Sequence, residues 1–294
     1  MRPLGFLVFV LFLLSGAVLG QVKGVVTDQT TGKPVPYANI WVENENLGTT
    51  SDEAGKFSLS NAATGKTLVV SCLGYDRAKV DAHAGVMTVK LVPVQTTLKE
   101  VVVKKNMPRD KKIINKLSDR TEFAFSSNGT PWIVAQYIPY QPSFSATPFL
   151  DEIALVTLSN IKKAKFKVHL YKVGEDGAPG ADLLPVPLVV EAGKGVQKVA
   201  VDVSLYDVQI PKTGVFIAFE WLILKQNIYE KEDSETGQKI KGSVAYEPSI
   251  RTYGPSSQKR NGWIYDQGRW RSTDEKDGDG ITQASPHFQL TLSN

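Results

Sequence analysis

The sequence predicts an all-β protein built from two β-sandwiches in succession. Apolar and polar residues alternate over short runs, and Gly, Pro, Asn and Asp break these runs about every 8 to 12 residues. The 294 residues exceed one typical domain of about 100 to 150 residues. We therefore expect one sandwich over residues 21–103 and a second over residues 121–294, for which a jelly roll is the topology considered.

The N-terminus has the pattern of a secretory signal peptide. Arg2 precedes an apolar run from Leu4 to Leu14, and small residues follow up to Gly20. The alternative is a membrane anchor, but a span needs about 20 apolar residues. We expect residues 1–20 to be removed, no transmembrane span to remain, and export to the periplasm or to the cell surface in association with the outer membrane. Position 21 is Gln, so lipid attachment to a cysteine there is not expected.

The first unit shows short strands separated by turn residues. Thr31-Gly32 and Asp52 to Gly55 supply the turns. The expected strands cover residues 22–26, 38–42, 49–50, 56–59, 67–72, 78–80, 87–91 and 98–103. Cys72 is the single cysteine, so no internal disulfide forms, and its apolar strand predicts a small buried side chain.

The order and spacing of several short motifs resemble the carboxypeptidase regulatory-like family. These motifs include Gly24-Val25-Val26-Thr27-Asp28, Thr31-Gly32-Lys33-Pro34, Gly48-Thr49-Thr50-Ser51-Asp52, Gly55-Lys56-Phe57 and Gly74-Tyr75. The resemblance implies a seven-stranded, transthyretin-like sandwich of the kind found at the N-terminus of exported Bacteroidota proteins, including TonB-dependent receptors. It implies an accessory module without peptidase activity. The segment Gly48 to Asp52 is read as a turn, with a ligand loop as the alternative.

Residues 104–120 read as a linker. Lys104, Lys105 and Pro108 interrupt the strand pattern. Within the linker, Asp110 to Leu117 spaces its apolar residues on one helical face, so a short helix is expected there.

The second unit again reads as strands. They are expected over residues 132–138, 153–158, 164–173, 188–191, 197–203, 215–224, 244–253, 263–270 and 287–292. The alternation from Lys165 to Leu170 predicts one buried face and one wet face. Residues 230–242 read as an exposed hairpin tip.

Composition and motifs argue against catalysis and against nucleic-acid binding. Loss of Arg2 with the signal peptide lowers the formal charge from +4 to +3, and no basic cluster is interleaved with aromatic residues. His83, His169 and His287 are isolated in the sequence, and no G-x-S-x-G pattern of a serine hydrolase is present. His169 lies on the polar side of its strand, so we expect a solvated side chain there rather than a catalytic base. No cofactor is expected.

Two groups of residues remain as candidate sites. Asp274, Asp277 and Asp279 lie in one Gly-containing segment, for which calcium binding is the alternative to a solvated turn. Trp263, Tyr265 and Trp270 flank the tight turn Asp266 to Arg269 and place aromatic rings on adjacent strands. With Tyr246 and Tyr253 they are candidates for a glycan-binding surface; sheet packing is the default reading.

These observations predict an exported, non-catalytic envelope protein that acts as a binding or docking module, with an envelope protein or a glycan as its partner. A hydrolase with an unrecognised active site in the second unit is the alternative. A third reading is a receptor-associated accessory domain in which Glu100 to Val103 contacts the TonB system.

Overall fold

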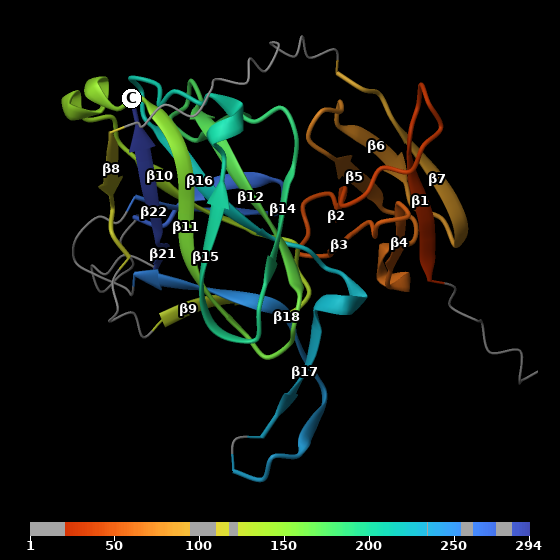
Figure 1. Ribbon diagram of the computed structural model, residues 1–294. Helices are drawn as coiled ribbons and strands as arrows, with labels where there is room; N and C mark the ends of the chain where they lie inside the picture. The colour runs from red at the N-terminus through yellow and green to blue at the C-terminus, as the bar shows by residue number, and fades with distance from the viewer. Residues whose placement is uncertain (1–20, 95–109, 118–122, 234, 254–260, 275–283) are drawn as a thin grey trace, which may run out of the picture.

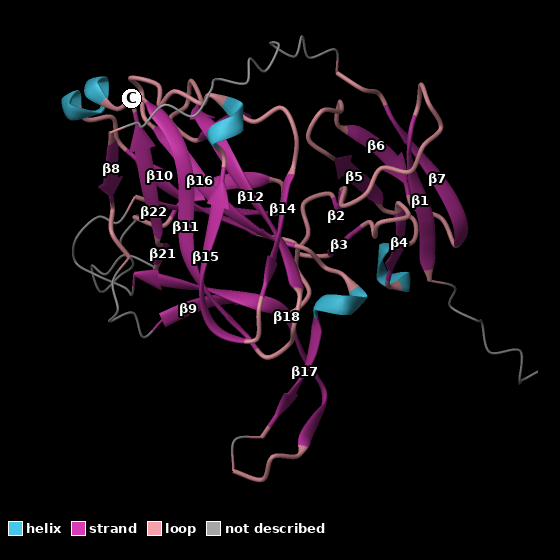
Figure 2. Cartoon of the chain, in the orientation of Figure 1, coloured by secondary structure: helices cyan, strands magenta, loops and turns pink. Residues whose placement is uncertain are grey.

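The computed structural model describes residues 21–94, 110–117, 123–233, 235–253, 261–274 and 284–294 (Figure 1). Its regular structure is almost all β-strand, with four short 3-10 turns (Figure 2). Over these described ranges, no helix is long and apolar enough to cross a membrane. The all-β prediction is confirmed.

The first unit is a sandwich of two sheets, with strand orders β4-β1-β7 and β3-β2-β5-β6. β1 pairs antiparallel with β4 and parallel with β7. The strands are β1 (Val22–Asp28), β2 (Asn39–Val42), β3 (Gly48–Thr50), β4 (Lys56–Leu59), β5 (Thr67–Ser71), β6 (Ala78–Asp81) and β7 (Gly85–Leu91). The strand predicted over residues 98–103 lies outside the described residues.

The second unit has a seven-stranded and an eight-stranded sheet. In the seven-stranded sheet the order is β13-β12-β16-β10-β19-β20, and β14 also pairs with β12. In the eight-stranded sheet the order is β17-β18-β11-β22-β8; in addition, β15 pairs with β11, and β9 and β21 pair with β18. The described strands therefore outnumber the eight of a simple jelly roll. They are β8 (Lys111–Ile114), β9 (Phe123–Ser127), β10 (Ile133–Ile138), β11 (Phe149–Ser159), β12 (Ala164–Val173), β13 (Pro179–Asp182), β14 (Leu188–Ala192), β15 (Gly195–Asp202), β16 (Val215–Trp221), β17 (Ile228–Glu232), β18 (Lys239–Tyr253), β19 (Gly262–Asp266), β20 (Arg269–Ser272), β21 (Ser285–Pro286) and β22 (Phe288–Ser293).

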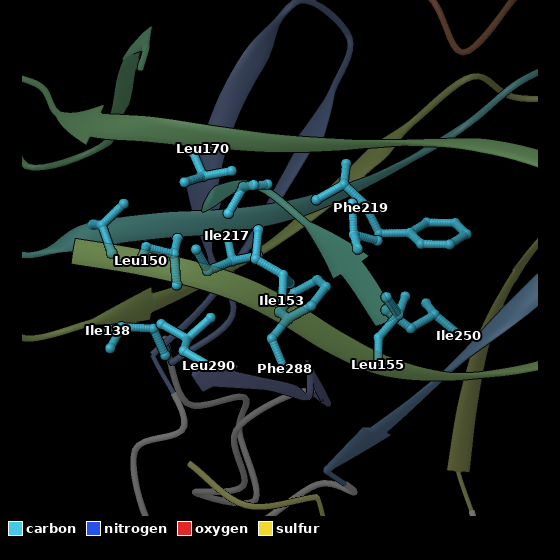
Figure 3. Close-up of a cluster of buried hydrophobic side chains, with 14 of the residues drawn as sticks. Ile138, Leu150, Ile153, Leu155, Leu170, Ile217, Phe219, Ile250, Phe288 and Leu290 are labelled. Carbon is cyan, nitrogen blue, oxygen red and sulfur yellow. The ribbon is translucent and has the colours of Figure 1, made fainter. Parts of the chain in front are cut away.

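The main core fills the space between these two sheets (Figure 3). Leu170 and Phe219 come from the seven-stranded sheet, while Ile153, Leu155 and Phe288 come from the eight-stranded sheet, and all five are fully buried. The first unit has a core of its own that includes Val26, Ile40 and Leu68. Each unit thus buries its own apolar residues.

The helix predicted over residues 110–117 is wrong. Lys111–Ile114 forms the edge strand β8, which pairs with β22. A helix this short is not stable without docking, whereas β22 offers free backbone groups to the β-branched residues Ile113 and Ile114. This segment therefore belongs to the second sandwich rather than to a linker.

Separate cores predict that the first unit folds alone. A protein ending at Lys105 should give well-dispersed amide NMR signals, because all the pairing within both of its sheets is local to residues 22–91. Poor dispersion would show that the first unit depends on the second.

Candidate binding cleft between the two units

The outer face of the seven-stranded sheet packs against the first unit. Along β12, Phe166, Val168 and Leu170 point into the core, so the alternating residues Lys167 and His169 point outward. The prediction that this face of β12 is exposed to solvent is wrong. Lys167 is 3% exposed and His169 is 7% exposed, because the first unit covers this part of the strand.

Hydrogen bonds join the two units directly. Lys167 Nζ donates to the backbone carbonyl of Tyr37 at 2.6 Å, and the backbone N–H of Ile223 donates to Thr50 Oγ1 at 2.9 Å. Gly48 lies so close to Pro131 that an added Cβ would come within 2.8 Å of the proline ring. The segment containing Gly48 and Thr50 is thus a docking contact, and its small residues allow the two backbones to approach.

Beneath this contact lies a charge network of four residues, Lys167, His169, Asp182 and Glu220. Glu220, on the neighbouring strand β16, accepts from Lys167 Nζ at 3.2 Å and bonds with His169 Nε2 at 2.6 Å. His169 Nδ1 bonds with Asp182 Oδ2 at 2.9 Å. The second oxygen of Asp182 accepts the backbone N–H of Leu184 at 2.9 Å. Both nitrogens of the His169 ring are therefore engaged by carboxylates.

These contacts fix the protonation states of His169 and Glu220. Burial lowers the pKa of His169, but the bonds with Asp182 and Glu220 outweigh it and raise that pKa to about 9. Burial raises the pKa of Glu220, but the charge of Lys167 and the bond with His169 outweigh it and lower that pKa to about 2. At neutral pH the pair is an imidazolium and a carboxylate. The solvated role predicted for His169 is wrong, because its strand faces a domain contact rather than water.

Aromatic rings continue the same outer face. Tyr171 stacks on His169, with ring centroids 5.1 Å apart, and contacts Trp270 edge-on at 5.7 Å. Tyr265 lies 5.2 Å from Trp270, and Trp41 of the first unit contacts Tyr265 edge-on at 6.1 Å. The hairpin carrying Tyr265 and Trp270 turns through Gln267 and Gly268, both with positive φ, as a two-residue turn requires.

The network and the rings line one cleft of about 580 Å³ between the two units. The first unit contributes Asn39, Trp41, Ser71, Cys72, Leu73 and Arg77, and the second contributes Ile133, Lys167, His169, Tyr171, Asp176, Ala178, Pro179, Gly180, Asp182, Glu220, Tyr265, Gly268, Arg269 and Trp270. Its volume lies within the range of about 300 to 1,000 Å³ typical of small-molecule sites. Cys72 is partly exposed there rather than fully buried, and burial raises the pKa of its thiol.

The structure brings together some of the predicted site residues and separates others. Tyr265 and Trp270 line the cleft, and Trp263 lies on the same hairpin, packed on Phe216. Tyr246 and Tyr253 lie on β18 of the opposite sheet, where Tyr253 stacks on His287. The five aromatic residues therefore do not form one surface.

The predicted calcium residues are only partly described. Asp274 accepts the backbone N–H of Asn261 at 2.8 Å, which is the role of a loop-closing side chain. Asp277 and Asp279 lie outside the described residues. Within the described ranges, no three His, Cys, Asp or Glu side chains gather as metal ligands.

The sequence alone did not point to six residues of the cleft as site residues: Arg77, Lys167, His169, Asp182, Glu220 and Arg269. One signal was available. Glu220 interrupts the strand Val215–Trp221, whose other residues are apolar, and a carboxylate in such a strand needs a buried partner. The partners themselves come from β12 and β13, and only the tertiary fold places them beside it.

Comparison with known proteins identifies the first unit. Residues 22–103 match the CarboxypepD_reg-like domain, which confirms the resemblance seen in the sequence. Within this region, the TonB-dependent receptor SusC of Bacteroides thetaiotaomicron is 44% identical over 82 residues, covering 28% of this chain and 8% of the receptor.

Two solved structures show only a distant likeness. One is a candidate carbohydrate-binding protein of Bacteroides uniformis, at 11% identity and a TM-score of 0.22, covering 79% of this chain and 97% of that one. The other is from infectious bursal disease virus, at 9% identity and a TM-score of 0.26, covering 95% of this chain and 63% of that one.

The network predicts a large effect of Glu220→Gln on stability. Removing this carboxylate leaves Lys167 and His169 without their shared counter-charge, which we expect to cost about 3 to 5 kcal/mol in the free energy of unfolding. Glu191→Gln is the control, because Glu191 is half exposed and lies 3.9 Å from Lys165; it should cost about 1 kcal/mol or less. Urea unfolding measures both, and equal losses would contradict the prediction.

The raised pKa of His169 predicts weaker stability in alkali. The folded-state pKa of about 9 exceeds the ordinary value of 6.5. The stabilisation is therefore fully present below pH 6.5 and is lost as the pH rises through 9, by roughly 3 kcal/mol. Melting temperatures of the native protein should fall between pH 6.5 and 9.5, and those of His169→Gln should fall less. Parallel curves for the two proteins would refute this assignment.

Proposed function

Because residues 22–103 match the CarboxypepD_reg-like domain, we propose that this chain is an exported, non-catalytic binding module of a bacterial cell envelope. In this proposal the first sandwich docks on the second and forms one wall of the cleft that takes the ligand. The observation that carries the proposal is the cleft itself, which is lined by aromatic rings and polar groups from both units.

The state of the charged groups favours binding over catalysis. A general base needs a free lone pair, but both nitrogens of His169 are bonded to carboxylates and the ring is protonated at neutral pH. A general acid needs a proton that it can pass to a ligand, but Glu220 is ionised with a pKa of about 2, and both N–H groups of the His169 imidazolium are bonded to carboxylates. These groups are suited to holding a fixed surface rather than to exchanging protons.

The aromatic residues supply the contact area. Trp270 and Tyr265 are partly exposed within the cleft, and Trp41 of the first unit contacts the Tyr265 ring edge-on. Large rings give binding area at a small cost in side-chain entropy, and their polar edges allow hydrogen bonding. A ligand in the cleft would touch rings from both units.

The likeness to a TonB-dependent receptor supports an envelope location, as does the predicted signal peptide over residues 1–20. The chain spans only 8% of that receptor, so the receptor's transport role is not carried over. We place the protein in the periplasm or at the outer membrane, with a glycan as the ligand class.

Replacing Trp270 with alanine tests the cleft. Glycan-array screening of the purified chain should detect a bound glycan. Trp270→Ala should weaken that binding at least tenfold, because it removes a large aromatic ring that lines the cleft. Trp263→Ala is the matched control, since it removes a ring of the same hairpin that lies outside the cleft lining.

Melting temperatures measured alongside separate lost binding from lost folding. If the two variants melt alike and bind alike, the cleft is not the binding site. Turnover of a glycan or a peptide by the purified chain would overturn the non-catalytic proposal and favour the hydrolase.

A further inference from the structure

We infer that the ligand of this cleft is an acidic saccharide, a sugar that carries a carboxylate. The inference rests on the proposed binding function and adds the charge of the ligand to it. Its basis is that Arg77 of the first unit and Arg269 of the second line the same cleft.

Both arginines are exposed, and neither has an ion-pair partner among the described residues. The neighbouring arginine behaves differently, because Arg271 lies 3.4 Å from Asp266 and pairs with it. Within the described part of the chain, no carboxylate therefore occupies the N–H donors of Arg77 and Arg269. The planar guanidinium presents N–H groups in a fork that matches the two oxygens of a carboxylate.

The acidic groups of the cleft do not oppose an anion. Asp182 and Glu220 are buried and bonded to His169, and Glu220 also pairs with Lys167, so the charges of this network balance. Asp176 is the other acidic residue of the lining, and its Oδ1 accepts the backbone N–H of Ala178 at 3.1 Å. Outside this balanced network, two arginines and one aspartate give the described lining of the cleft a net positive charge.

The remaining lining fits a sugar better than a bare anion. Trp270 and Tyr265 offer ring surface for the apolar face of a pyranose. Asn39 lies on the first-unit wall of the cleft and is 6% exposed. The volume of about 580 Å³ also exceeds what a small anion fills.

Calorimetric titration of the purified chain with matched disaccharides tests the inference. The pairs are digalacturonate and galactobiose, diglucuronate and its glucose counterpart, and dimannuronate and its mannose counterpart. In at least one pair the acidic member should bind tenfold or more tightly than the neutral one, because hydrogen bonds to charged groups are the strong ones.

The double variant Arg77→Gln/Arg269→Gln should abolish this preference while leaving the melting temperature unchanged, since neither arginine forms an ion pair with a described residue. Lys172→Gln/Lys198→Gln is the matched control. It removes the same charge from exposed lysines of β12 and β15 outside the lining, and it should keep the preference.

Equal or tighter binding of every neutral member would overturn the acidic class and leave the proposed binding function standing. Retention of the preference in the arginine double variant would also overturn it. If no disaccharide binds, the acidic class is wrong, and the Trp270 comparison decides the proposed function separately.

Discussion

Lys167, His169 and Glu220 are charged residues of two adjacent strands that are buried where the sandwiches meet. Taking such charges out of water costs several kcal/mol for each ion unless partners surround them. Glu220 holds Lys167 and His169 together, Asp182 occupies the second ring nitrogen of His169, and the carbonyl of Tyr37 accepts from Lys167. The last of these partners belongs to the first unit. The charge arrangement of the second unit is therefore complete only when the first unit is docked.

Other features of the interface follow from this docking. Gly48 is needed where the backbone of the first unit meets Pro131, because a Cβ would collide with the proline ring. Thr50 is positioned so that its Oγ1 accepts a hydrogen bond from the backbone N–H of Ile223. Once these contacts are set, Trp41 is held against Tyr265, and the cleft has one wall from each unit.

The parts of the fold that depend on local pattern could be predicted from the sequence. The strand over residues 164–173 and the hairpin around Gln267 and Gly268 follow from alternation and turn chemistry, and both are present. The helix expected over residues 110–117 is wrong, because Ile113, Ile114 and Leu117 have helical spacing while the deciding partner, β22, lies far along the chain. In β8 the adjacent Ile113 and Ile114 point to opposite faces, and Ile113 is exposed.

The candidate site was harder to predict for a related reason. Alternation shows that Lys167 and His169 share a face, but it does not show what covers that face. Tyr265 and Trp270 could be found because aromatic residues near a tight turn are visible locally. Arg77 and Arg269 are far apart in the sequence, and only the docked arrangement of the two units places them on one cleft.

A charged interface also explains why this chain can support a defined cleft. An apolar contact of the same area would be as stabilising, since a buried ion pair rarely exceeds a well-packed hydrophobic replacement in stability. We expect, however, that it would constrain the orientation of the first unit less, because apolar contact is not directional. The hydrogen bonds from Lys167 to Tyr37 and from Ile223 to Thr50 depend on distance and angle and so favour one arrangement of the two units. We infer that the network contributes to the orientation of the two units more than to the strength of their contact, and this orientation brings Arg77 and Arg269 to the same cleft and Trp41 against Tyr265.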